Sequence, residues 1–492
     1  MHDQNTASDS GRARVEAHST DYIPESERHG TVWQQAPFWF MINGNVTTAL
    51  TGVVGASLGL SLVWCLAAIV TGGLFGTFFT AFHAAQGPQL GLPQMIQSRV
   101  QFGSRGLVVP LAVVVFVQCG FGVFFIILGA NSLSGITAPH NGFYEPLLCV
   151  VAAVIAIVGH DLVHRVQRWL SILVLVSLAL VTVAVLAEVD LSGLMSAGGF
   201  QWTAFLAQFG ASAAYQIALA PMVSDYTRYL PRKTGTRRVV GMVFLGSLAS
   251  ATWLELLGAV VTTARPGADT VSAIQHYGDS FLSGLGWITL AVTVLSMIGV
   301  LPTTFYSAAI NALSAFDAFR TVRPSARSRV VVIVVLVALT YVATAAIPDH
   351  YLGSFSSFLA LLSYLLIPWT AVNLVDFYLI RHSSYAIAEI LAPGGGVYGR
   401  WGGRGLISYT VGLAAMVPFF STSLYTGPLA HALDGADISP LVGLPVATLC
   451  YWLLMRGADL TAERTAIALD KDRLLTLRAD ASPAGSSLAQ PS

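Results

Sequence analysis

The feature that most constrains this chain is a series of long apolar runs, several of them without a single charged residue. A run of about 18 or more such residues is long enough to cross the hydrocarbon core of a bilayer as a helix. Lipid offers no hydrogen-bond partners, so the backbone must be satisfied within the helix itself. Only 10% of the residues are charged, whereas a soluble domain carries about a quarter. The sequence therefore predicts an all-α polytopic membrane protein embedded in a lipid bilayer.

Twelve apolar segments divide the chain. They fall at about 36–60, 62–84, 107–134, 143–160, 169–189, 202–222, 239–264, 281–314, 328–347, 351–379, 405–426 and 437–456. The polar residues 1–32 lack the basic start, apolar core and cleavage site of a signal peptide, and we expect a disordered cytoplasmic tail there. A twelve-helix membrane domain is expected over 33–456. A second cytoplasmic tail, helical at first and then disordered, is expected over 457–492.

The basic residues support twelve spans. With the N-terminus inside the cell, 24 of the 25 Lys and Arg fall on the cytoplasmic side, and only Arg265 falls opposite. A wrong number of spans would scramble this alternation. We therefore expect a multi-pass plasma-membrane protein with both termini in the cytoplasm. The basic stretch "PMVSDYTRYLPRKTGTRR", residues 221–238, would anchor the cytoplasmic end of the sixth segment.

Glycine, proline and amide residues gather inside four of the segments. They occur in "NGNVTTALTGVVG" (43–55), "QCGFG" (118–122), "QFGASAAYQIALAP" (208–221) and "SMIGVLPTT" (296–304). Segments 1 and 6, and segments 3 and 8, are each five apart, as in two inverted repeats of five helices. The repeats would cover about 36–189 and 202–379, followed by two further helices over about 405–456. Such interruptions predict a central binding site between segments 1, 3, 6 and 8.

Three stretches resemble the nucleobase:cation symporter-1 family, specifically its purine–cytosine permease branch. They are "GPQLGLPQMIQSRVQFGSRG" (87–106), "SDYTRYLP" (224–231) and "LIPWTAVNLVDFYLIR" (366–381). The resemblance extends from about Trp33 to the twelfth segment. It implies a LeuT-like fold of 12 transmembrane helices, a 5+5 inverted repeat plus two C-terminal helices. It also implies a secondary active importer of a nucleobase or related heterocycle.

The resemblance also implies residue roles. Family members hold a flat heterocycle between aromatic side chains of helices 3 and 6, and offset stacking suits any planar base. Phe121 and Tyr215 are the stacking candidates here. Gln118 and Gln216 are the amides for the edge of the base, where an unpaired buried polar group discriminates strongly between substrates. The alternative for each of these four residues is that its side chain only packs in the protein core and does not contact substrate.

Other positions complete the predicted substrate site and show where this chain departs from the family. Asn43 lies in the first cluster, and Pro302 and Thr303 lie in the eighth segment. The family often has an aromatic residue where Leu219 stands and Asn where Thr303 stands, and Phe121 replaces a Trp. The substrate is therefore left open among cytosine, purines, uracil-like bases, allantoin, hydantoins and thiamine-related pyrimidines.

The coupling ion is expected to be a proton in preference to sodium. Sodium-coupled members use hydroxyls of helix 8, but residues 299–301 carry none. Glu255 is the only carboxylate well inside a predicted span, and acids in that setting often serve ion or proton paths. A neutral Glu255 bonded to a neighbouring helix, or one wetted from outside, is the alternative. Asp225 pairing with a nearby Arg, such as Arg228, is expected to act as an inner gate.

Other classes of protein are less consistent with the sequence. A carrier of the same fold for amino acids would need a helix interruption that binds a carboxylate in place of the stacking pair. No P-loop, HExxH motif or metal-ligand cluster is present, so we expect neither an enzyme nor a cofactor other than the coupling cation. A channel is disfavoured because the polar clusters converge on one point. We expect no nucleic-acid partner, and the oligomeric state is left open.

Overall fold

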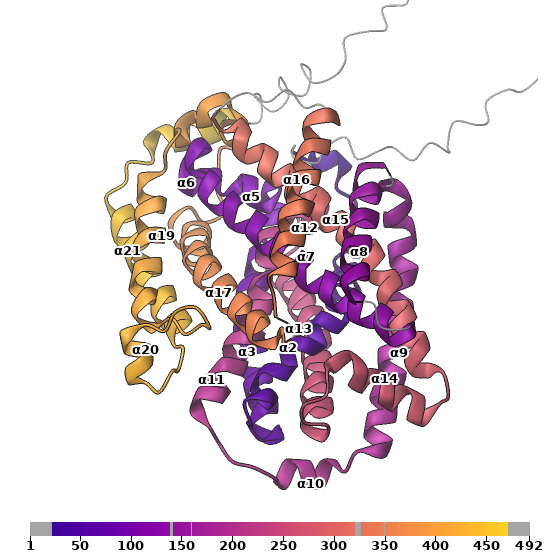
Figure 1. The fold of residues 1–492 in the computed structure, drawn as a ribbon. Helices are drawn as coiled ribbons and strands as arrows, with labels where there is room; N and C mark the ends of the chain where they lie inside the picture. The colour runs from indigo at the N-terminus through magenta and orange to yellow at the C-terminus, as the bar shows by residue number, and fades with distance from the viewer. Residues whose placement is uncertain (1–21, 138–140, 159, 320–325, 349, 471–492) are drawn as a thin grey trace, which may run out of the picture.

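The described part of the chain is helical. The computed structural model describes residues 22–137, 141–158, 160–319, 326–348 and 350–470, and within these ranges the only β-pairing is one isolated bridge (Figure 1). The α-helices are α1 (Gln35–Ile42), α2 (Val46–Ser57), α3 (Leu62–Ala84), α4 (Gln86–Leu90), α5 (Gln94–Gln97), α6 (Arg99–Gly106), α7 (Val108–Ile136), α8 (Asn141–Val158), α9 (His160–Glu188), α10 (Leu191–Ser196), α11 (Trp202–Ile217), α12 (Val223–Thr227), α13 (Thr236–Ala264), α14 (Thr270–Phe281), α15 (Leu285–Asp317), α16 (Ala326–Ala345), α17 (Leu352–Val375), α18 (Ile387–Leu391), α19 (Gly403–Met416), α20 (Pro428–Ala432) and α21 (Ser439–Arg456).

Each of the twelve predicted segments contains at least one of these helices. Within the described ranges, eight helical stretches are long and apolar enough to cross a membrane. The remaining predicted segments hold shorter helices: the α1–α2 pair, α8, the α11–α12 pair and α19. A polytopic membrane protein is thereby supported, and twelve as the number of spans stays a prediction.

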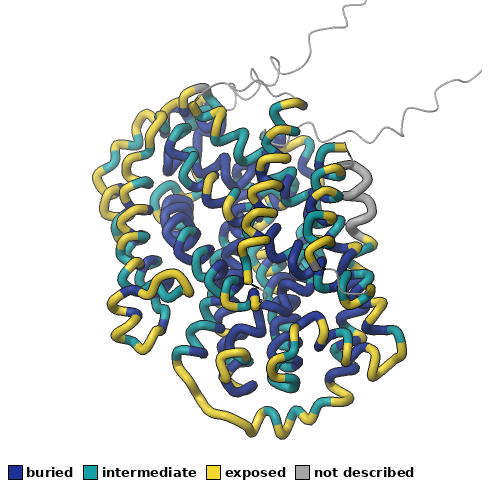
Figure 2. The backbone as a smooth tube through the Cα atoms, in the orientation of Figure 1, coloured by how far each residue is buried: buried dark blue, intermediate teal, exposed yellow. Residues whose placement is uncertain are grey.

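Two groups of helices pack against each other around the middle of the molecule. In one group, α13 packs along α1, α2 and α3, and α11 packs along α2 and α3. In the other, α15 packs along α7, α8, α9 and α16. Helix α17 contacts α11 of the first group and α7 of the second. Buried positions concentrate between the helices and exposed ones on the outward faces (Figure 2).

Two glycines allow α2 and α13 to approach backbone to backbone. A Cβ at Gly52 would lie 1.8 Å from the carbonyl oxygen of Glu255, and one at Gly258 would lie 1.8 Å from that of Ala49. Small residues permit such contacts between membrane helices, where dispersion between closely packed atoms replaces the hydrophobic effect. The close approach fixes α2, and with it the interruption between α1 and α2, against α13.

Two of the four predicted interruptions are absent. Helix α7 runs unbroken through the "QCGFG" cluster, and α15 runs unbroken past Pro302. A proline removes only one backbone donor, and side-chain hydroxyls can satisfy nearby carbonyls in a membrane helix. Thr303 and Thr304 both donate to the carbonyl of Val300, at 2.7 and 3.0 Å, whereas the carbonyl that loses its donor at Pro302 is that of Ile298. Packing along α7 and α9 therefore holds α15 continuous.

The predicted tails are partly ordered. The sequence predicts disorder over 1–32, but within the described part Ile23 is buried and bonds the carbonyl of Gly91, and Arg28 donates to the carbonyl of Pro88 (2.7 Å). These contacts satisfy backbone groups of the turn after α3. Residues 461–470 are helical, in keeping with the predicted start of the C-terminal tail. Residues 1–21 and 471–492 lie outside the described residues. The first and last described residues lie at one end of the molecule, with α5 and α6 (Figure 1).

Candidate functional site

The first predicted segment is interrupted between α1 and α2, at Asn43, Gly44 and Asn45. Asn45 caps α2 by accepting a hydrogen bond from the main-chain N–H of Thr48 (3.2 Å), and its amide donates to the carbonyl of Ile42 (3.1 Å). An Asn suits this position because its oxygen satisfies an N–H that has no partner within the helix. The predicted interruption is confirmed, and one side chain holds both half-helices.

The sixth predicted segment is interrupted after α11, where the chain passes through Ala218 and Leu219 into a 3-10 turn and α12. Tyr215 and Gln216 lie in the last turn of α11. Thr80 on α3 donates to the carbonyl of Gln216 (2.7 Å), which satisfies a backbone group at the helix end. This interruption is confirmed as well.

A side-chain hydrogen bond joins the two interruptions. The hydroxyl oxygens of Thr48 and Tyr215 lie 2.6 Å apart, and Thr48 donates to the carbonyl of Asn43 (2.6 Å). Ser247 on α13 bonds the side-chain amides of Asn43 and Gln216. Asn43 donates to its carbonyl (2.9 Å), and its hydroxyl donates to Gln216 Oε1 (2.7 Å). The structure thus brings Asn43, Tyr215 and Gln216 together at one point.

Phe121 on α7 lies beside this point, across the boundary between the two helix groups. Its ring centroid is 5.9 Å from that of Tyr215 and 5.2 Å from that of Phe358 on α17, with the planes nearly perpendicular in both pairs. These are edge-to-face contacts. The predicted stacking pair is therefore in direct contact, and a flat ligand can enter between the two rings only after one of them turns. Leu219 packs instead with the cluster around Trp39.

Gln118 lies one turn before Phe121 and faces α15. Its amide nitrogen donates to Ser307 (2.7 Å), and its oxygen accepts from Asn311 (3.2 Å). Pro302 lies buried in the same helix. Thr303, which donates to the α15 backbone, is half-buried. The structure therefore joins Gln118 to α15, whereas Tyr215 and Gln216 belong to the group around α13.

Glu255 is buried in α13 and belongs to a chain of polar groups that reaches α2. One carboxylate oxygen accepts a hydrogen bond from Ser212 on α11, which in turn accepts one from Gln208 (3.0 Å). Gln208 donates to the carbonyl of Thr51 (3.1 Å) and accepts from the main-chain N–H of Gly55 (2.8 Å). The other oxygen, Oε1, is buried with no hydrogen-bond partner in the described part of the chain. Sequence reasoning found Glu255 but not Ser212, because a Ser in an apolar run carries no distinctive signal.

The two predicted gating residues lie on and directly after α12. Asp225 accepts a hydrogen bond from the main-chain N–H at the start of α5, that of Gln94 (2.9 Å). Arg228 is buried, donates to the main-chain carbonyl of Asp225 (3.2 Å) and lies 5.2 Å from the ring centroid of Tyr229. The Asp225 side chain thus bonds the loop after α3, and the Arg228 side chain packs within the turn that follows α12.

The three stretches that carry the family resemblance meet in one buried polar cluster. Ser224 donates to Gln94 (2.6 Å), whose amide donates to Gln86 (2.9 Å). Gln86 donates in turn to Asn373 on α17 (2.6 Å). A network of this kind is stable in the membrane only when its members satisfy one another. The stretches are therefore together in space because they tie α12, α17 and the loop after α3 into one junction.

A histidine lies at the centre of this junction. The ring of His83 on α3 is parallel to that of Trp369 at 4.7 Å, and its Nδ1 lies 3.2 Å from the Gln94 amide. Trp369 donates to Ser98 (3.0 Å). Sequence reasoning missed His83 and Asn373. Both are polar residues inside predicted spans, and that property should have singled them out as it did Glu255.

A second buried polar cluster follows α17 and lies next to the cluster around His83. Asp376 is fully buried, accepts from Gln101 (2.6 Å) and Tyr451 (2.8 Å), and forms an ion pair with Arg381. Glu463, in the helical start of the C-terminal segment, accepts from Arg381 (2.8 Å). Burial lowers the pKa of the Arg381 guanidinium, but Asp376, Tyr451 and Glu463 together raise it by more, so its pKa lies above the ordinary value.

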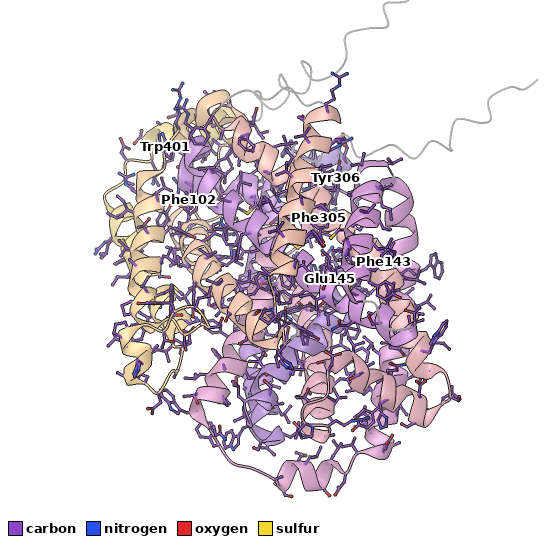
Figure 3. The ribbon with its side chains drawn as sticks, viewed as in Figure 1. Phe102, Phe143, Glu145, Phe305, Tyr306 and Trp401 are labelled. Atoms are coloured by element: carbon purple, nitrogen blue, oxygen red, sulfur yellow. The ribbon has the colours of Figure 1, made fainter. Side chains whose placement is uncertain are left out.

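Helix α6, which carries Gln101, also contacts the segment before α19. Backbone hydrogen bonds join Phe102 to Gly402 (2.6 Å) and Arg105 to Arg400 (2.8 Å). Gly103 has φ +78°, and a Cβ there would lie 2.6 Å from the carbonyl of Arg400, so this position favours glycine. Phe102 and the neighbouring Trp401 lie at the same end of the molecule as the chain termini (Figure 3).

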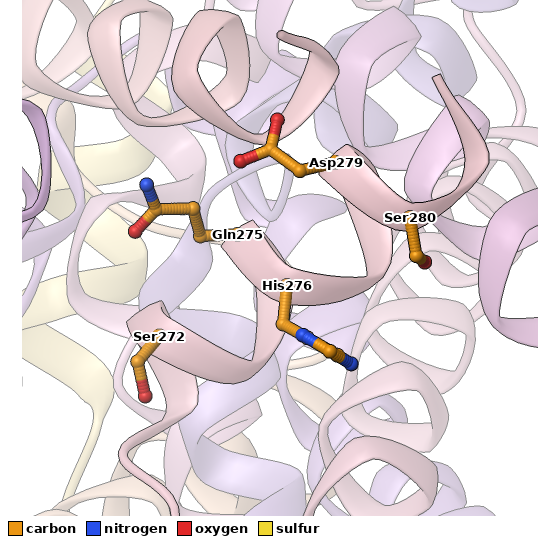
Figure 4. Close-up of a pocket in the computed structure, with 5 residues that line it drawn as sticks. All are labelled: Ser272, Gln275, His276, Asp279 and Ser280. Atoms are coloured by element: carbon orange, nitrogen blue, oxygen red, sulfur yellow. The ribbon is translucent and has the colours of Figure 1, made fainter. Parts of the chain in front are cut away.

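The opposite end carries a surface hollow of about 310 Å³ on α14. Its lining residues are Ser272, Gln275, His276, Asp279 and Ser280 (Figure 4). Ser280 donates to Glu188 at the end of α9, and Gln275 donates to the carbonyl of Gly135 in α7 (3.3 Å). These bonds tie α14 to the ends of two long helices. The hollow contains none of the predicted substrate-site residues.

Known proteins resemble this chain over most of its length. The family model described as "Permease for cytosine/purines, uracil, thiamine, allantoin" matches residues 22–443. YxlA of Bacillus subtilis, a candidate purine-cytosine permease, is 34% identical over 444 residues, which cover 90% of this chain and 96% of that protein. The purine-cytosine permease fcyB of Emericella nidulans is 25% identical over 471 residues, covering 89% and 88% of the two chains.

Among solved structures, the transporter Mhp1 has the same fold. Its inward-facing conformation superposes with a TM-score of 0.75 at 18% identity, covering 94% of this chain and 98% of Mhp1. Its closed conformation with bromovinylhydantoin bound gives a TM-score of 0.70 over 93% and 99% of the two chains. The expected LeuT-like architecture is confirmed, and the matched proteins are transporters and not enzymes. The chain belongs to the family of permeases for cytosine/purines, uracil, thiamine and allantoin, the nucleobase:cation symporter-1 family that its sequence resembles.

Proposed function

We propose that this protein imports a nucleobase or a related flat heterocycle by symport with a cation, most simply a proton. The observation that carries the proposal is the hydrogen bond between Thr48 and Tyr215, which joins the two helix interruptions beside Phe121. Interrupted helices supply backbone and side-chain polar groups at the middle of a transporter. An aromatic ring at the same point adds a surface for a planar ligand.

In this proposal, Phe121 and Tyr215 bind the faces of the heterocycle. Tyr215 supplies the aromatic ring of the sixth segment because Leu219 packs into the cluster around Trp39, on the α1 and α13 side. Gln118 forms one polar border together with its partners Ser307 and Asn311 on α15. Pro302 and Thr303 lie about one turn before Ser307 on the same helix. Asn43 and Gln216 with Ser247 form the other border. Asn43 Oδ1 is buried with no partner among the described residues, which leaves an acceptor for a ring N–H.

A purine or cytosine is the favoured substrate because the two relatives that cover nine-tenths of this chain bear purine-cytosine permease names. Allantoin, hydantoins, thiamine-related pyrimidines and amino acids are the alternatives. A hydantoin is the second candidate, since Mhp1 was solved with bromovinylhydantoin bound. Both are flat rings with donors and acceptors on one edge, so the same borders can serve either.

Proton coupling is proposed through Glu255. Its partner Ser212 lies one turn before Tyr215 and Gln216 on α11, so the carboxylate is linked to the helix that carries the proposed substrate groups. Its second oxygen has no hydrogen-bond partner among the described residues, which leaves it able to take up a proton. Residues 299–301 of α15, where sodium-coupled members carry hydroxyls, have none, which disfavours a sodium site.

We further propose that the end bearing α5, α6 and the basic stretch 228–238 faces the cytoplasm of the cell. Asp225 and Arg228 lie at that end, where α12 meets the loop after α3. An inward opening must part α12 from this loop, so the bond from Gln94 to Asp225 is the contact that such a gate would break.

Ligand-dependent thermal stability tests the substrate proposal. A ligand that binds only the folded state raises the melting temperature in proportion to RT ln(1 + [L]/Kd). We expect cytosine or a purine to raise it, and Phe121→Ala to abolish the rise while Phe143→Ala, a change of an exposed residue on α8, preserves it. A rise with an amino acid and with none of cytosine, adenine, hypoxanthine, uracil, allantoin or a hydantoin would contradict the proposal.

A further inference from the structure

An apolar groove of about 320 Å³ runs along the outside of the molecule between α1 and α13. Its lining includes Pro37, Phe40 and Met41 from α1 and Leu245, Gly246 and Ala249 from α13. A Cβ at Gly246 would lie 2.1 Å from the carbonyl of Ala36, so the glycine lets the two helices touch and forms the floor of the groove. The volume lies within the range of sites that hold small molecules, roughly 300–1,000 Å³.

The face of α13 that borders the groove ends in a basic residue. Positions 238, 241, 245 and 249 lie three, four and four residues apart, which places them on one face of a helix. Arg238, Gly241, Leu245 and Ala249 are all exposed on that face. Arg238 lies two turns before Leu245, about 10 Å along the helix axis. The exposed face of α13 that lines the groove at Leu245 and Ala249 therefore carries a cation about two turns beyond the groove.

Three further basic residues precede Arg238 in the sequence. Arg232, Lys233 and Arg237 are exposed close to Arg238 in the sequence. Among the residues that the structure describes, none of these four forms an ion pair with an Asp or Glu. A positive cluster at the end of an apolar groove has the chemistry of a site for an anionic lipid, with the headgroup at the charges and an acyl chain in the groove.

We propose that the groove between α1 and α13 is a binding site for one anionic phospholipid. Its phosphate lies at Arg237 and Arg238, and one acyl chain lies over Gly241 and against Leu245, Ala249 and Phe40. A zwitterionic lipid fills the groove equally well but lacks the net attraction to the cations. The same α1 helix ends at Asn43, so the lipid sits on the half-helix that leads to the interruption.

Native mass spectrometry of the purified full-length protein tests the site. The probes are phosphatidylglycerol and phosphatidylcholine with identical acyl chains, and the readout is the fraction of protein that retains one lipid. We expect preferential retention of phosphatidylglycerol. Arg238→Gln should lower its apparent affinity about fivefold, as expected for one cation near a lipid headgroup, without changing phosphatidylcholine binding. Ala249→Phe, which fills the groove, should lower retention of both lipids.

Matched controls separate the site from general attraction to the membrane surface. Arg456→Gln removes an exposed cation at the end of α21 and should leave phosphatidylglycerol retention unchanged. Free glycerol 3-phosphate should not displace the lipid. Equal retention of the two lipids would overturn the proposal. So would an effect of Arg238→Gln without one of Ala249→Phe, because the headgroup would then bind without the groove. Unchanged melting temperatures establish that each variant is folded.

Discussion

The Tyr215 hydroxyl lies 2.6 Å from that of Thr48, and this contact connects the interruption in the first segment to the interruption in the sixth. Thr48 is at the start of α2, and Tyr215 is in the last turn of α11. Because Thr48 donates its own proton to the carbonyl of Asn43, the phenol is the donor to Thr48. The half-helices α2 and α11 are thus joined at their interrupted ends by this hydrogen bond, and about one to two turns away by the bonds of Gln208 to the backbone of α2.

Tyr215→Phe tests this contact because it removes the hydroxyl and retains the ring. The loss of one buried hydrogen bond is worth about 1 kcal/mol, and we expect an apparent substrate affinity about fivefold weaker. Initial rates of uptake over a range of substrate concentrations measure it. Tyr409→Phe is the control, since it removes a comparable hydrogen bond to the carbonyl of Leu365 away from the site. Equal effects of the two changes would show that the bond is only structural.

Glu255→Gln tests proton coupling. The amide oxygen can still accept from Ser212, so the fold is expected to persist, but the side chain can no longer exchange a proton. We expect pH-driven accumulation of substrate to be lost while exchange of labelled for unlabelled substrate continues. Glu188→Gln, at the partly exposed outer end of α9, should leave both activities intact. Full accumulation by the Glu255→Gln protein would remove this residue from the coupling path.

Gly52→Ala tests the close packing of α2 on α13. The added methyl group would overlap the backbone of Glu255, and overpacking of this kind costs about 1–3 kcal/mol. We expect a lower melting temperature and lower yield. Gly210→Ala is the matched control, because a Cβ there meets no atom within 4 Å and alanine favours the helix by about 0.5–1 kcal/mol. Similar melting temperatures for the two variants would be inconsistent with the packing described.

Single introduced cysteines test which end of the protein faces the cytoplasm. Gly235→Cys lies before α13 at the basic end, and Ser272→Cys lies exposed on α14 at the other end. A maleimide that cannot cross the membrane should label only Ser272→Cys in intact cells, and both positions after the cells are opened. Labelling of Gly235→Cys in intact cells would reverse the proposed orientation of the protein.

The sequence predicted the helices and the two true interruptions because both leave local signals. Length and apolarity mark the spans, and the Asn–Gly–Asn cluster marks a break that an Asn side chain can cap. The same reasoning was wrong for α7 and α15. Gly and Pro signal a possible break, but the packing of α7 against α15 keeps both helices continuous.

Contacts between residues far apart in the chain were harder to predict from the sequence. Gln118 and Gln216 were expected at one substrate edge, yet each bonds a different helix, α15 or α13. The cluster of Gln86, Gln94 and Asn373 joins residues up to 287 positions apart. No local pattern encodes such pairs, although the resemblance of their three stretches to one family indicated that they shared a role.

Uptake by the purified protein in proteoliposomes tests the central claim most directly. Labelled cytosine, adenine, hypoxanthine, uracil and allantoin would be offered under an imposed pH gradient and, separately, under an imposed sodium gradient, with Gln118→Ala as the control. We predict accumulation of at least one base, driven by the pH gradient and lost in the variant. No accumulation of any base under either gradient, from protein that shows normal thermal unfolding, would contradict the claim that this permease carries nucleobases.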